Sequence, residues 1–384
     1  MIDASGYTIL PGFIDVHTHL GAGLEGGLDP NAAFASEKVM AVARNARLTL
    51  MAGVTTVRDL GGLDYGFARN VFERGDVAAP RTHTAITILS PTGGHADFHL
   101  RNGNPVSTVD FPEIEGGNLI DSDDQTRKAI HVLIRSGADC VKVATTGGVS
   151  SPSDTPDDVG ITAHQLELMR EELSKRGGRP IAAHAQGIDG IWQAIEGGVD
   201  SVEHGYGITD EAVDALLEKD IWLVPTLASA LRVPDPAKVP AYLYEKKVKW
   251  SSLARENITN AIKRGVRVAA GTDAAIVPHG LNLREIGHLV ELGMEPMQAI
   301  VSGTKNGATL MGLDEHLGTL EEGKLADLVA VKFNPLDPNE TKKLGLLDNV
   351  RVVMQGGLVH KDLDHAFGDL YLPPLVAQTF AQPE

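Results

Sequence analysis

Two histidines one residue apart, His17 and His19, follow a short apolar run near the start of the chain that is typical of a β-strand. Because side chains alternate between the two faces of a strand, both imidazoles project from the same side and can bind one metal ion. If this strand lines a barrel, the other ligands must come from the ends of later strands.

Four more residues with suitable chemistry lie within or at the end of later apolar runs. Lys142 lies inside the apolar run 140–144, where a lysine is unexpected unless a partner compensates its charge. His184, His204 and Asp273 each end such a run. Taken singly, each of these three is more simply explained as a structural residue. Because all strand ends of a barrel surround one opening, the ordered set predicts a common site.

The composition indicates a globular protein without a nucleic-acid or membrane partner. The chain has 384 residues and a formal net charge of −17, whereas nucleic acids and anionic membranes favour positive patches. No apolar run approaches the roughly 18 residues that a membrane span needs. The single cysteine, Cys140, excludes an internal disulfide framework and a multi-thiolate zinc site. The first residues carry no recognisable signal peptide, so we expect a cytoplasmic location.

A regular alternation of short apolar runs and amphipathic stretches predicts an α/β fold. Strands are expected near 12–18, 54–59, 83–89, 140–145, 180–184, 200–204, 221–225 and 267–272. Helices are expected at 31–51, 123–136, 164–176, 188–196, 210–219, 239–264 and 283–292. Ser122 with Gln125 and Thr162 with Gln165 match the capping pattern of a helix start. Eight strand–helix units predict a (β/α)₈ TIM barrel over residues 11–312.

Outside this pattern, long connections and a small β appendage are predicted. The connections 90–121 and 145–160 both follow strands, which places them over the opening of the barrel. Short strands at 326–332, 349–355 and 357–360 predict a β-sandwich-like appendage formed by residues 1–10 and 313–384. Such a small β layer has exposed edges, so we expect a homo-oligomer, additional coverage or further chain at the N-terminus.

Several ordered motifs resemble one enzyme family. The chain is similar to the amidohydrolase superfamily, and specifically to its binuclear-metal branch of prolidase-like Xaa-Pro and Xaa-Arg dipeptidases and ochratoxin-hydrolysing amidases. The similarity extends from residue 10 to about residue 360, and any single motif alone is weak. The matching stretches are Pro11–His19, Gly53–Asp59, Thr92–His95, the strand around Lys142, Glu203–Gly205, Gly271–Asp273 and Gly318–Leu328.

The resemblance implies a centre with two divalent metal ions. His17, His19 and Asp273 would hold one ion, while His184 and His204 would hold the other. Lys142, carboxylated by CO₂ on its ε-nitrogen, would bridge both ions. Zinc is expected because imidazole and carboxylate suit it, although iron, manganese or cobalt could replace it.

The resemblance also implies hydrolysis of an amide or peptide-like bond. A hydroxide bridging the metals would attack the carbonyl, and Asp273 would transfer its proton to the leaving nitrogen. The expected substrate is small and ends in a free α-carboxylate: a dipeptide such as Xaa-Pro, or an N-acyl amino acid, including ochratoxin-like compounds. His95 and Tyr206 are candidate hydrogen-bond donors to the developing oxyanion.

Alternatives remain open at this level. A lactonase, a phosphotriesterase or a cyclic-amide hydrolase such as imidazolonepropionase would use the same fold, but the last type lacks the bridging lysine, against which Lys142 argues. A barrel that binds metal without catalysis would be expected to have lost a ligand. Among neighbouring residues, Arg58 and Asp59 are interpreted as an ion pair, with substrate binding by Arg58 as a weaker alternative. His279 is interpreted as a locally bonded loop residue, and the run 246–249 as a solvated helix face.

Overall fold

The strands that carry the predicted site form two parallel sheets. The computed structural model describes residues 4–22, 34–97, 115–151 and 154–366. The first parallel sheet has the order β2 (Phe13–Thr18), β3 (Val54–Asp59) and β4 (Arg81–Thr84). The second has the order β5 (Ile88–Leu89), β6 (Val141–Ala144), β7 (Ile181–Ala185), β8 (Ser201–His204) and β9 (Trp222–Val224). This is an α/β architecture of the TIM-barrel type, as predicted.

Two of the predicted strands are less regular than expected. The predicted strand 83–89 is divided into β4 and β5, because Ile86 between them has a φ of 68°. The predicted strand 267–272 is not a regular strand and makes only isolated bridges, from Val268 to Leu223 of β9 and from Ala274 to Thr18 of β2. Asp273 has a φ of 59°, which interrupts extended pairing at this point. The irregular segment nevertheless connects the last strand of the second sheet with the first strand of the first sheet.

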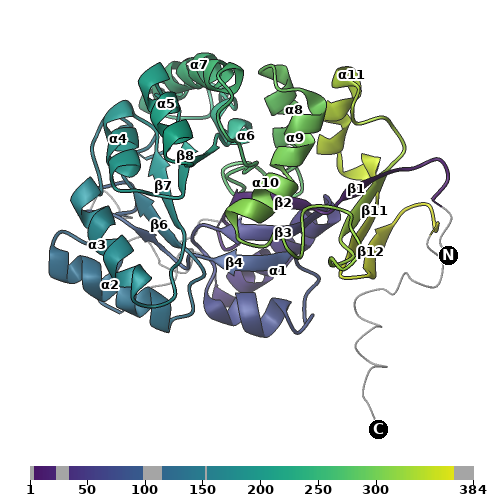
Figure 1. Ribbon diagram of the computed structural model, residues 1–384, viewed down its shortest axis with the longest axis horizontal. Helices are drawn as coiled ribbons and strands as arrows, with labels where there is room; N and C mark the ends of the chain where they lie inside the picture. Colours follow the sequence, from purple (N-terminus) through teal and green to yellow (C-terminus); the bar gives the residue numbers. More distant parts are fainter. Residues whose placement is uncertain (1–3, 23–33, 98–114, 152–153, 367–384) are drawn as a thin grey trace, which may run out of the picture.

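The major helices lie on the outside of these sheets (Figure 1). They are α1 (Ala35–Met51), α2 (Asp123–Arg135), α3 (Ala163–Ser174), α4 (Ile188–Glu196), α5 (Asp210–Glu218), α7 (Ala241–Lys263) and α8 (Arg284–Glu291). Shorter helices are η1 (Gly66–Phe72), α6 (Leu227–Ala230), α9 (Pro296–Ser302), α10 (Lys305–Leu310), α11 (Pro338–Thr341), η3 (Lys342–Gly345) and η4 (Leu347–Asn349). Among the described residues, no helix is both long and apolar enough to cross a membrane.

The helix starts follow the predicted capping pattern. The hydroxyl of Ser122 accepts a hydrogen bond from the backbone N–H of Gln125 at 3.3 Å. Thr162 and Gln165 form a reciprocal capping box at the start of α3, which satisfies backbone groups that a helix end leaves unpaired. The start of the predicted helix 31–51 falls partly outside the described residues, since the described part of α1 begins at Ala35.

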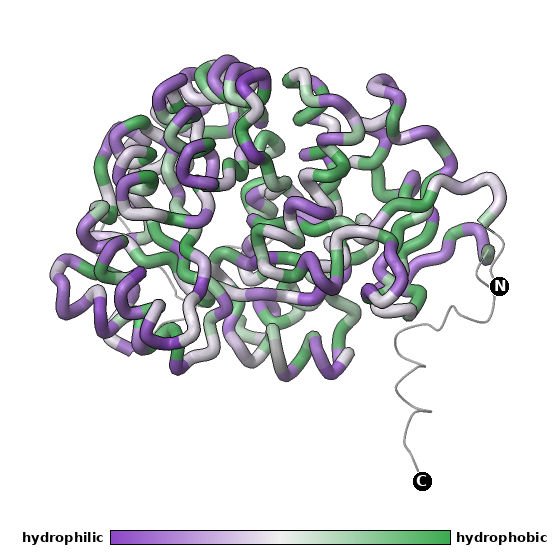
Figure 2. Tube along the Cα trace, viewed as in Figure 1, coloured by the Kyte–Doolittle hydropathy of each residue, from purple (hydrophilic) through white to green (hydrophobic). Residues whose placement is uncertain are grey.

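The core lies between the strands and the helices. Val141 and Val143 of β6 are fully buried in the same apolar cluster as Ile130 and Leu133 of α2. Their neighbour Lys142, on the opposite face of the strand, is equally buried. Figure 2 shows hydrophobic segments concentrated along the strands and hydrophilic segments along the outer helices. The alternation along β6 therefore places valines against the helices and directs the lysine into the barrel.

The chain ends form a four-stranded antiparallel sheet at one side of the barrel (Figure 1). Its order is β1 (Thr8–Pro11), β10 (Leu328–Val331), β11 (Val350–Gln355) and β12 (Leu358–Asp362). The predicted joining of the N-terminal strand to this appendage is present, with Thr8 opposite Val331. The domain boundaries at residues 10 and 312 stay a prediction.

Asp327 connects this appendage to the barrel. Its carboxylate accepts two hydrogen bonds from the guanidinium of Arg81 in β4, one of them at 3.0 Å, and another from the backbone N–H of Gly356 at 2.7 Å. Its backbone carbonyl accepts from Gly12 N–H at 2.9 Å, directly before β2. Because β2 carries His17, the appendage helps to fix the strand on which the site is built.

The Asp327 contacts predict a measurable loss of stability on mutation. Asp327→Ala removes a charge-assisted, bidentate pair and leaves Arg81 and Gly356 without their acceptor, so we expect the free energy of unfolding to fall by about 2 kcal/mol. Urea denaturation measures this change. The exposed Glu315→Ala is the matched control and should change stability by less than about 0.5 kcal/mol. Equal midpoints for the two variants would contradict the role of Asp327.

Candidate functional site

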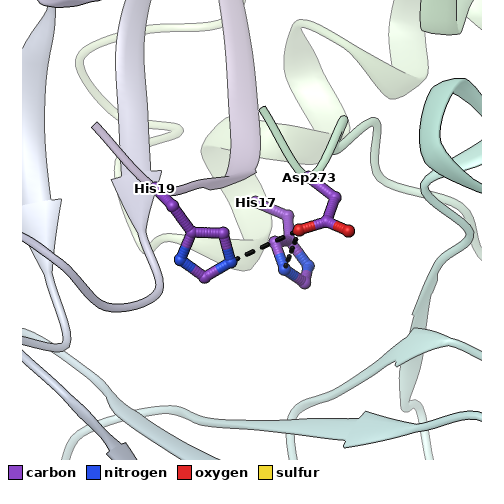
Figure 3. A group of neighbouring side chains, drawn as sticks. All are labelled: His17, His19 and Asp273. Carbon is purple, nitrogen blue, oxygen red and sulfur yellow. Dashed lines mark ion pairs between the residues drawn. The ribbon is translucent and has the colours of Figure 1, made fainter. Parts of the chain in front are cut away.

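His17, His19 and Asp273 lie together at the carboxyl end of β2 and at the end of the irregular segment (Figure 3). One carboxylate oxygen of Asp273 lies 3.4 Å from Nε2 of His19 and 3.7 Å from Nε2 of His17. A ligand atom from each of the three residues lies within 4.8 Å of the others, and all three are buried. This group has the spacing and the donor types of a divalent metal site.

In both histidines Nε2 faces Asp273, and Nδ1 has another polar partner in the protein. Nδ1 of His17 lies 2.7 Å from a carboxylate oxygen of Glu203, and Nδ1 of His19 donates to the carbonyl of Gly61 at 2.8 Å. A carbonyl can only accept, so Nδ1 of His19 carries a proton and Nε2 is the nitrogen that faces Asp273. This is the orientation that metal-binding histidines require.

His184 and His204 form a second group next to the first. The ring of His204 lies 5.0 Å from that of His17 and 4.6 Å from that of His184, between ring centroids. Nδ1 of His204 lies 2.7 Å from the hydroxyl of Thr226, and Nε2 of His184 donates to the carbonyl of Gly147 at 3.1 Å. Each ring therefore keeps its second nitrogen for another partner.

Lys142 is buried close enough to both groups for its charge to act on their histidines. Its side chain is among the largest that are fully buried, and its ammonium has no hydrogen bond within the described part of the chain. Its charge acts on His17, His184 and His204, which places it among the predicted ligands. Burial lowers the pKa of Lys142 to about 8, so roughly a tenth of the amine is neutral at pH 7.

Three of the four imidazoles, those of His17, His184 and His204, are kept in the neutral form that metals bind. Burial, followed by the charge of Lys142, holds the pKa of His17 well below its ordinary value, and burial lowers the pKa of His204 to about 3. For His19, the contact with Asp273 outweighs burial and raises the pKa. Burial would raise the pKa of Asp273, but its contacts with the histidines lower it, so the carboxylate is ionised. Asp273 is therefore an anion that is paired with His19 and lies beside the neutral ring of His17.

Three of these residues have a backbone conformation that costs energy. His204 has a φ of 72°, Thr226 a φ of 49° and Asp273 a φ of 59°, all in the left-handed region that side chains other than glycine rarely adopt. His204 ends β8, Thr226 lies two residues after β9, and Asp273 ends the irregular segment. Strain of this kind is typical of functional sites, where surrounding contacts hold the conformation.

His95 and Tyr206 lie at the edge of the cluster. The ring of His95 stacks on that of His184 with centroids 4.0 Å apart, and its Nδ1 lies 3.4 Å from a carboxylate oxygen of Asp154. The hydroxyl of Tyr206 lies 3.2 Å from that of Thr226, and its ring is 5.4 Å from that of His204. Both predicted residues are therefore near the ligands, while their roles stay predictions.

Comparison with known proteins identifies the family. A model described as the amidohydrolase family matches residues 8–359. The chain belongs to the amidohydrolase family. It is 31% identical to ochratoxinase of Aspergillus niger over 345 residues, which cover 86% of this chain and 71% of that protein. Membership makes it a hydrolase of C–N bonds, in a family that generally uses divalent metals.

Two solved structures are similar over nearly the whole chain. A Xaa-Pro dipeptidase crystal structure with bound methionine in its active site has a TM-score of 0.82 and 32% identity, over 93% of this chain and 87% of that one. A prolidase complexed with N-methylphosphonate-L-proline has a TM-score of 0.81 and 27% identity, over 94% and 88%. Both similarities support the TIM-barrel type of this amidohydrolase.

A buried ionic network behind His17 was not predicted. One carboxylate oxygen of Glu203 contacts His17, and the other accepts from the guanidinium of Arg58 at 2.8 Å and from the hydroxyl of Ser201. The predicted ion pair between Arg58 and Asp59 is therefore wrong, because these neighbours on β3 face opposite sides. Asp59 instead accepts from the backbone N–H of Leu20. The available signal was Glu203 itself, an acid inside an apolar strand.

Asp15 is a second residue that the sequence did not single out. Its carboxylate accepts from the Thr272 hydroxyl at 2.6 Å, from Asn282 at 2.8 Å and from the backbone N–H of His17 at 3.1 Å. It therefore ties β2 to the segment that carries Asp273. The buried His279 has Nδ1 3.3 Å from the hydroxyl of Thr49 in α1, a residue distant in the sequence, and its interpretation as a locally bonded loop residue stays a prediction.

The glycines after β6 allow His95 to approach. A Cβ on Gly148 would lie 2.1 Å from Cε1 of His95, and its three nearest atoms would all belong to that ring. Gly148 also donates its N–H to Asp154 at 3.0 Å. Lys246 of α7 donates to the backbone carbonyls of Ser151 and Asp154 in the same connection. The interpretation of 246–249 as a solvated helix face is thus wrong for Lys246.

The Glu203 network predicts an effect on metal binding in this amidohydrolase. Glu203→Gln keeps an oxygen that accepts from Arg58 but removes the charge that orients His17, so we expect affinity for the first divalent ion to fall by roughly 10- to 100-fold. Competition with a chromogenic chelator measures this affinity, and circular dichroism checks the fold. Glu211→Gln, on the exposed start of α5, is the control. An unchanged affinity in Glu203→Gln would show that the network serves only stability.

Proposed function

We propose that this amidohydrolase cleaves the amide bond of a small substrate that ends in a free α-carboxylate, a dipeptide such as Xaa-Pro or an N-acyl amino acid. The observation that carries the proposal is the fully buried Lys142, whose charge acts on His17, His184 and His204 and whose Nζ has no hydrogen-bond partner in the described part of the chain. The named relatives support the substrate class, since one is an ochratoxinase, one is a Xaa-Pro dipeptidase with bound methionine and one is a prolidase with a proline phosphonate.

The residues of the cluster fit a pair of divalent metal ions. We assign His17, His19 and Asp273 to one ion and His184 and His204 to the other. Lys142, carboxylated by CO₂, would bridge them as an anion. Burial lowers the pKa of its amine to about 8, which increases the share of the neutral amine that can react with CO₂. Zinc is the proposed ion because nitrogen and oxygen donors suit it. When bound, the ions would lower the pKa of water and polarise the scissile carbonyl.

The proton transfer is assigned to Asp273. Contacts with the histidines lower its pKa and keep it ionised, so it starts as a proton acceptor. As the oxygen of the attacking water forms a bond to the carbonyl carbon, Asp273 takes the proton of that water. It then gives this proton to the nitrogen as the C–N bond breaks, which leaves a carboxylic acid and an amine.

His95 and Tyr206 are assigned to the developing oxyanion. His95 is partly accessible, stacks on His184 and is oriented by Asp154. Burial raises the pKa of Tyr206, so its hydroxyl keeps the proton that it could donate. Donors fixed before the reaction stabilise charge without reorganisation.

Lys142 provides a direct test of the proposed centre. After exposure to ¹³C-bicarbonate we expect a carbamate resonance in the wild type and in Lys361→Met, but not in Lys142→Met. Lys361 is a matched control, since burial also lowers its pKa to about 8 but its ammonium donates to the carbonyls of Met51 and Leu347. Elemental analysis should show that Lys142→Met loses bound metal. A metal-loaded Lys142→Met of full activity would refute the proposal.

The contact between Gly148 and His95 allows a double-mutant test. Gly148 is outside the left-handed region, and the three atoms nearest to the Cβ of Gly148→Ala would all belong to the His95 ring. We expect Gly148→Ala and His95→Asn each to lower kcat by roughly 100-fold with unchanged metal content, and the double variant to be no slower than the slower single variant. Multiplicative losses would mean that Gly148 acts independently of His95, and unchanged kcat in His95→Asn would remove His95 from the reaction.

A further inference from the structure

The first half of α7 lies against the site. Trp250 of this helix packs in one buried cluster with Val149 and Tyr206, which follow β6 and β8, and with Ala230 of α6. Further along the helix, the side chain of Asn257 donates to the backbone carbonyl of Tyr206 at 2.8 Å. Connections that follow parallel strands gather at the opening of a barrel, so this face of α7 borders the opening.

Lys247 lies on that face, one turn before Trp250. Residues three apart on a helix are neighbours, so the buried stripe of Trp250, Ala254 and Ile258 continues to Lys247. Lys247 is partly buried, and the charge of Asp273 acts on its ammonium. Lys247 therefore lies on the face of α7 that borders the opening, within electrostatic range of Asp273.

The ammonium of Lys247 has no acceptor of its own. Within the described part of the chain, no hydrogen bond or ion pair holds it. Burial lowers the pKa of Lys247, while the charge of Asp273 opposes this effect. A partly desolvated cation without a partner favours the arrival of an anion.

Four other cations around the site are engaged by groups of the protein. Their partners are the backbone carbonyls of Ser151 and Asp154 for Lys246, the carboxylate of Asp157 for Lys249, the carbonyl of Ile276 for Arg232 and the carboxylate of Glu203 for Arg58. The weaker alternative that Arg58 binds substrate thus loses its support, because its guanidinium is buried and bound.

We infer that Lys247 binds the α-carboxylate of the substrate and so selects acyl amino acids and dipeptides over amides that lack this group. The inference rests on the proposed function for its substrate class. An ammonium at the rim, opposite the metal ligands, would hold the carboxylate end of the substrate outward while the scissile amide reaches the cluster. Lys247 would then determine specificity without taking part in the transfer of atoms.

The test compares substrates that differ only in the carboxylate. Alanyl-proline and alanyl-pyrrolidine are one such pair, and further N-acyl amino acids can be paired with their decarboxylated analogues. In the metal-loaded enzyme, Lys247→Met should lower kcat/KM for the carboxylate member by roughly 10- to 100-fold, mainly through KM. The decarboxylated member should change less than about twofold. Lys247→Arg should restore part of the loss, and Lys263→Met, exposed at the far end of α7, should change neither substrate.

A binding measurement separates this inference from the proposed hydrolysis. Calorimetry compares L-methionine with its decarboxylated amine on the metal-loaded wild type and Lys247→Met. Hydrolysis without preference for the carboxylate, or equal losses for both members of a pair, would overturn the role of Lys247 and leave the proposed hydrolysis intact. If no pair is hydrolysed but amino-acid binding depends on Lys247, the proposed hydrolysis is overturned and the carboxylate site is supported. Neither hydrolysis nor binding would overturn both.

Discussion

The structure depends on one buried carboxylate, that of Glu203 inside the barrel. It neutralises the guanidinium of Arg58 at 2.8 Å and contacts Nδ1 of His17 at 2.7 Å with its other oxygen. Arg58 in turn donates to the carbonyl of Val16 in β2. A buried charge without a partner would be strongly destabilising, so the three strands that contribute these residues are held in one relation. These contacts help to fix the position of His17, one of the proposed metal ligands.

The main features of the fold and the cluster could be predicted from the sequence. They follow from the regular alternation of strands and helices and from the order in which polar residues end the apolar runs. Polar residues that end successive apolar runs must meet at one end of a barrel, which is why His17, His184, His204 and Asp273 lie together. Strand irregularities were not predictable, since the φ of Ile86 depends on tertiary contacts rather than on local preference. The roles of these residues in metal binding and catalysis came from the family resemblance and not from their positions.

The residues that the sequence did not reveal act through partners distant in the chain. Glu203, Asp15 and Thr226 orient ligands by hydrogen bonds whose other ends lie in separate strands or connections. Lys246 looked like part of an exposed charged run, yet it binds the backbone of the connection that follows β6. The charge pattern of a helix indicates which face is exposed. It does not indicate which loops contact the first turns of that helix.

The pairing of β1 with β10 has a consequence for the order in which the molecule can be assembled. Residues 8–11 precede the first histidine by a few positions, yet their partners are residues 328–331. β1, which directly precedes the strand that carries His17, therefore cannot pair until residues 328–331 have been synthesised. A contact between segments so distant in the sequence slows folding, because the long stretch between them must first be brought together.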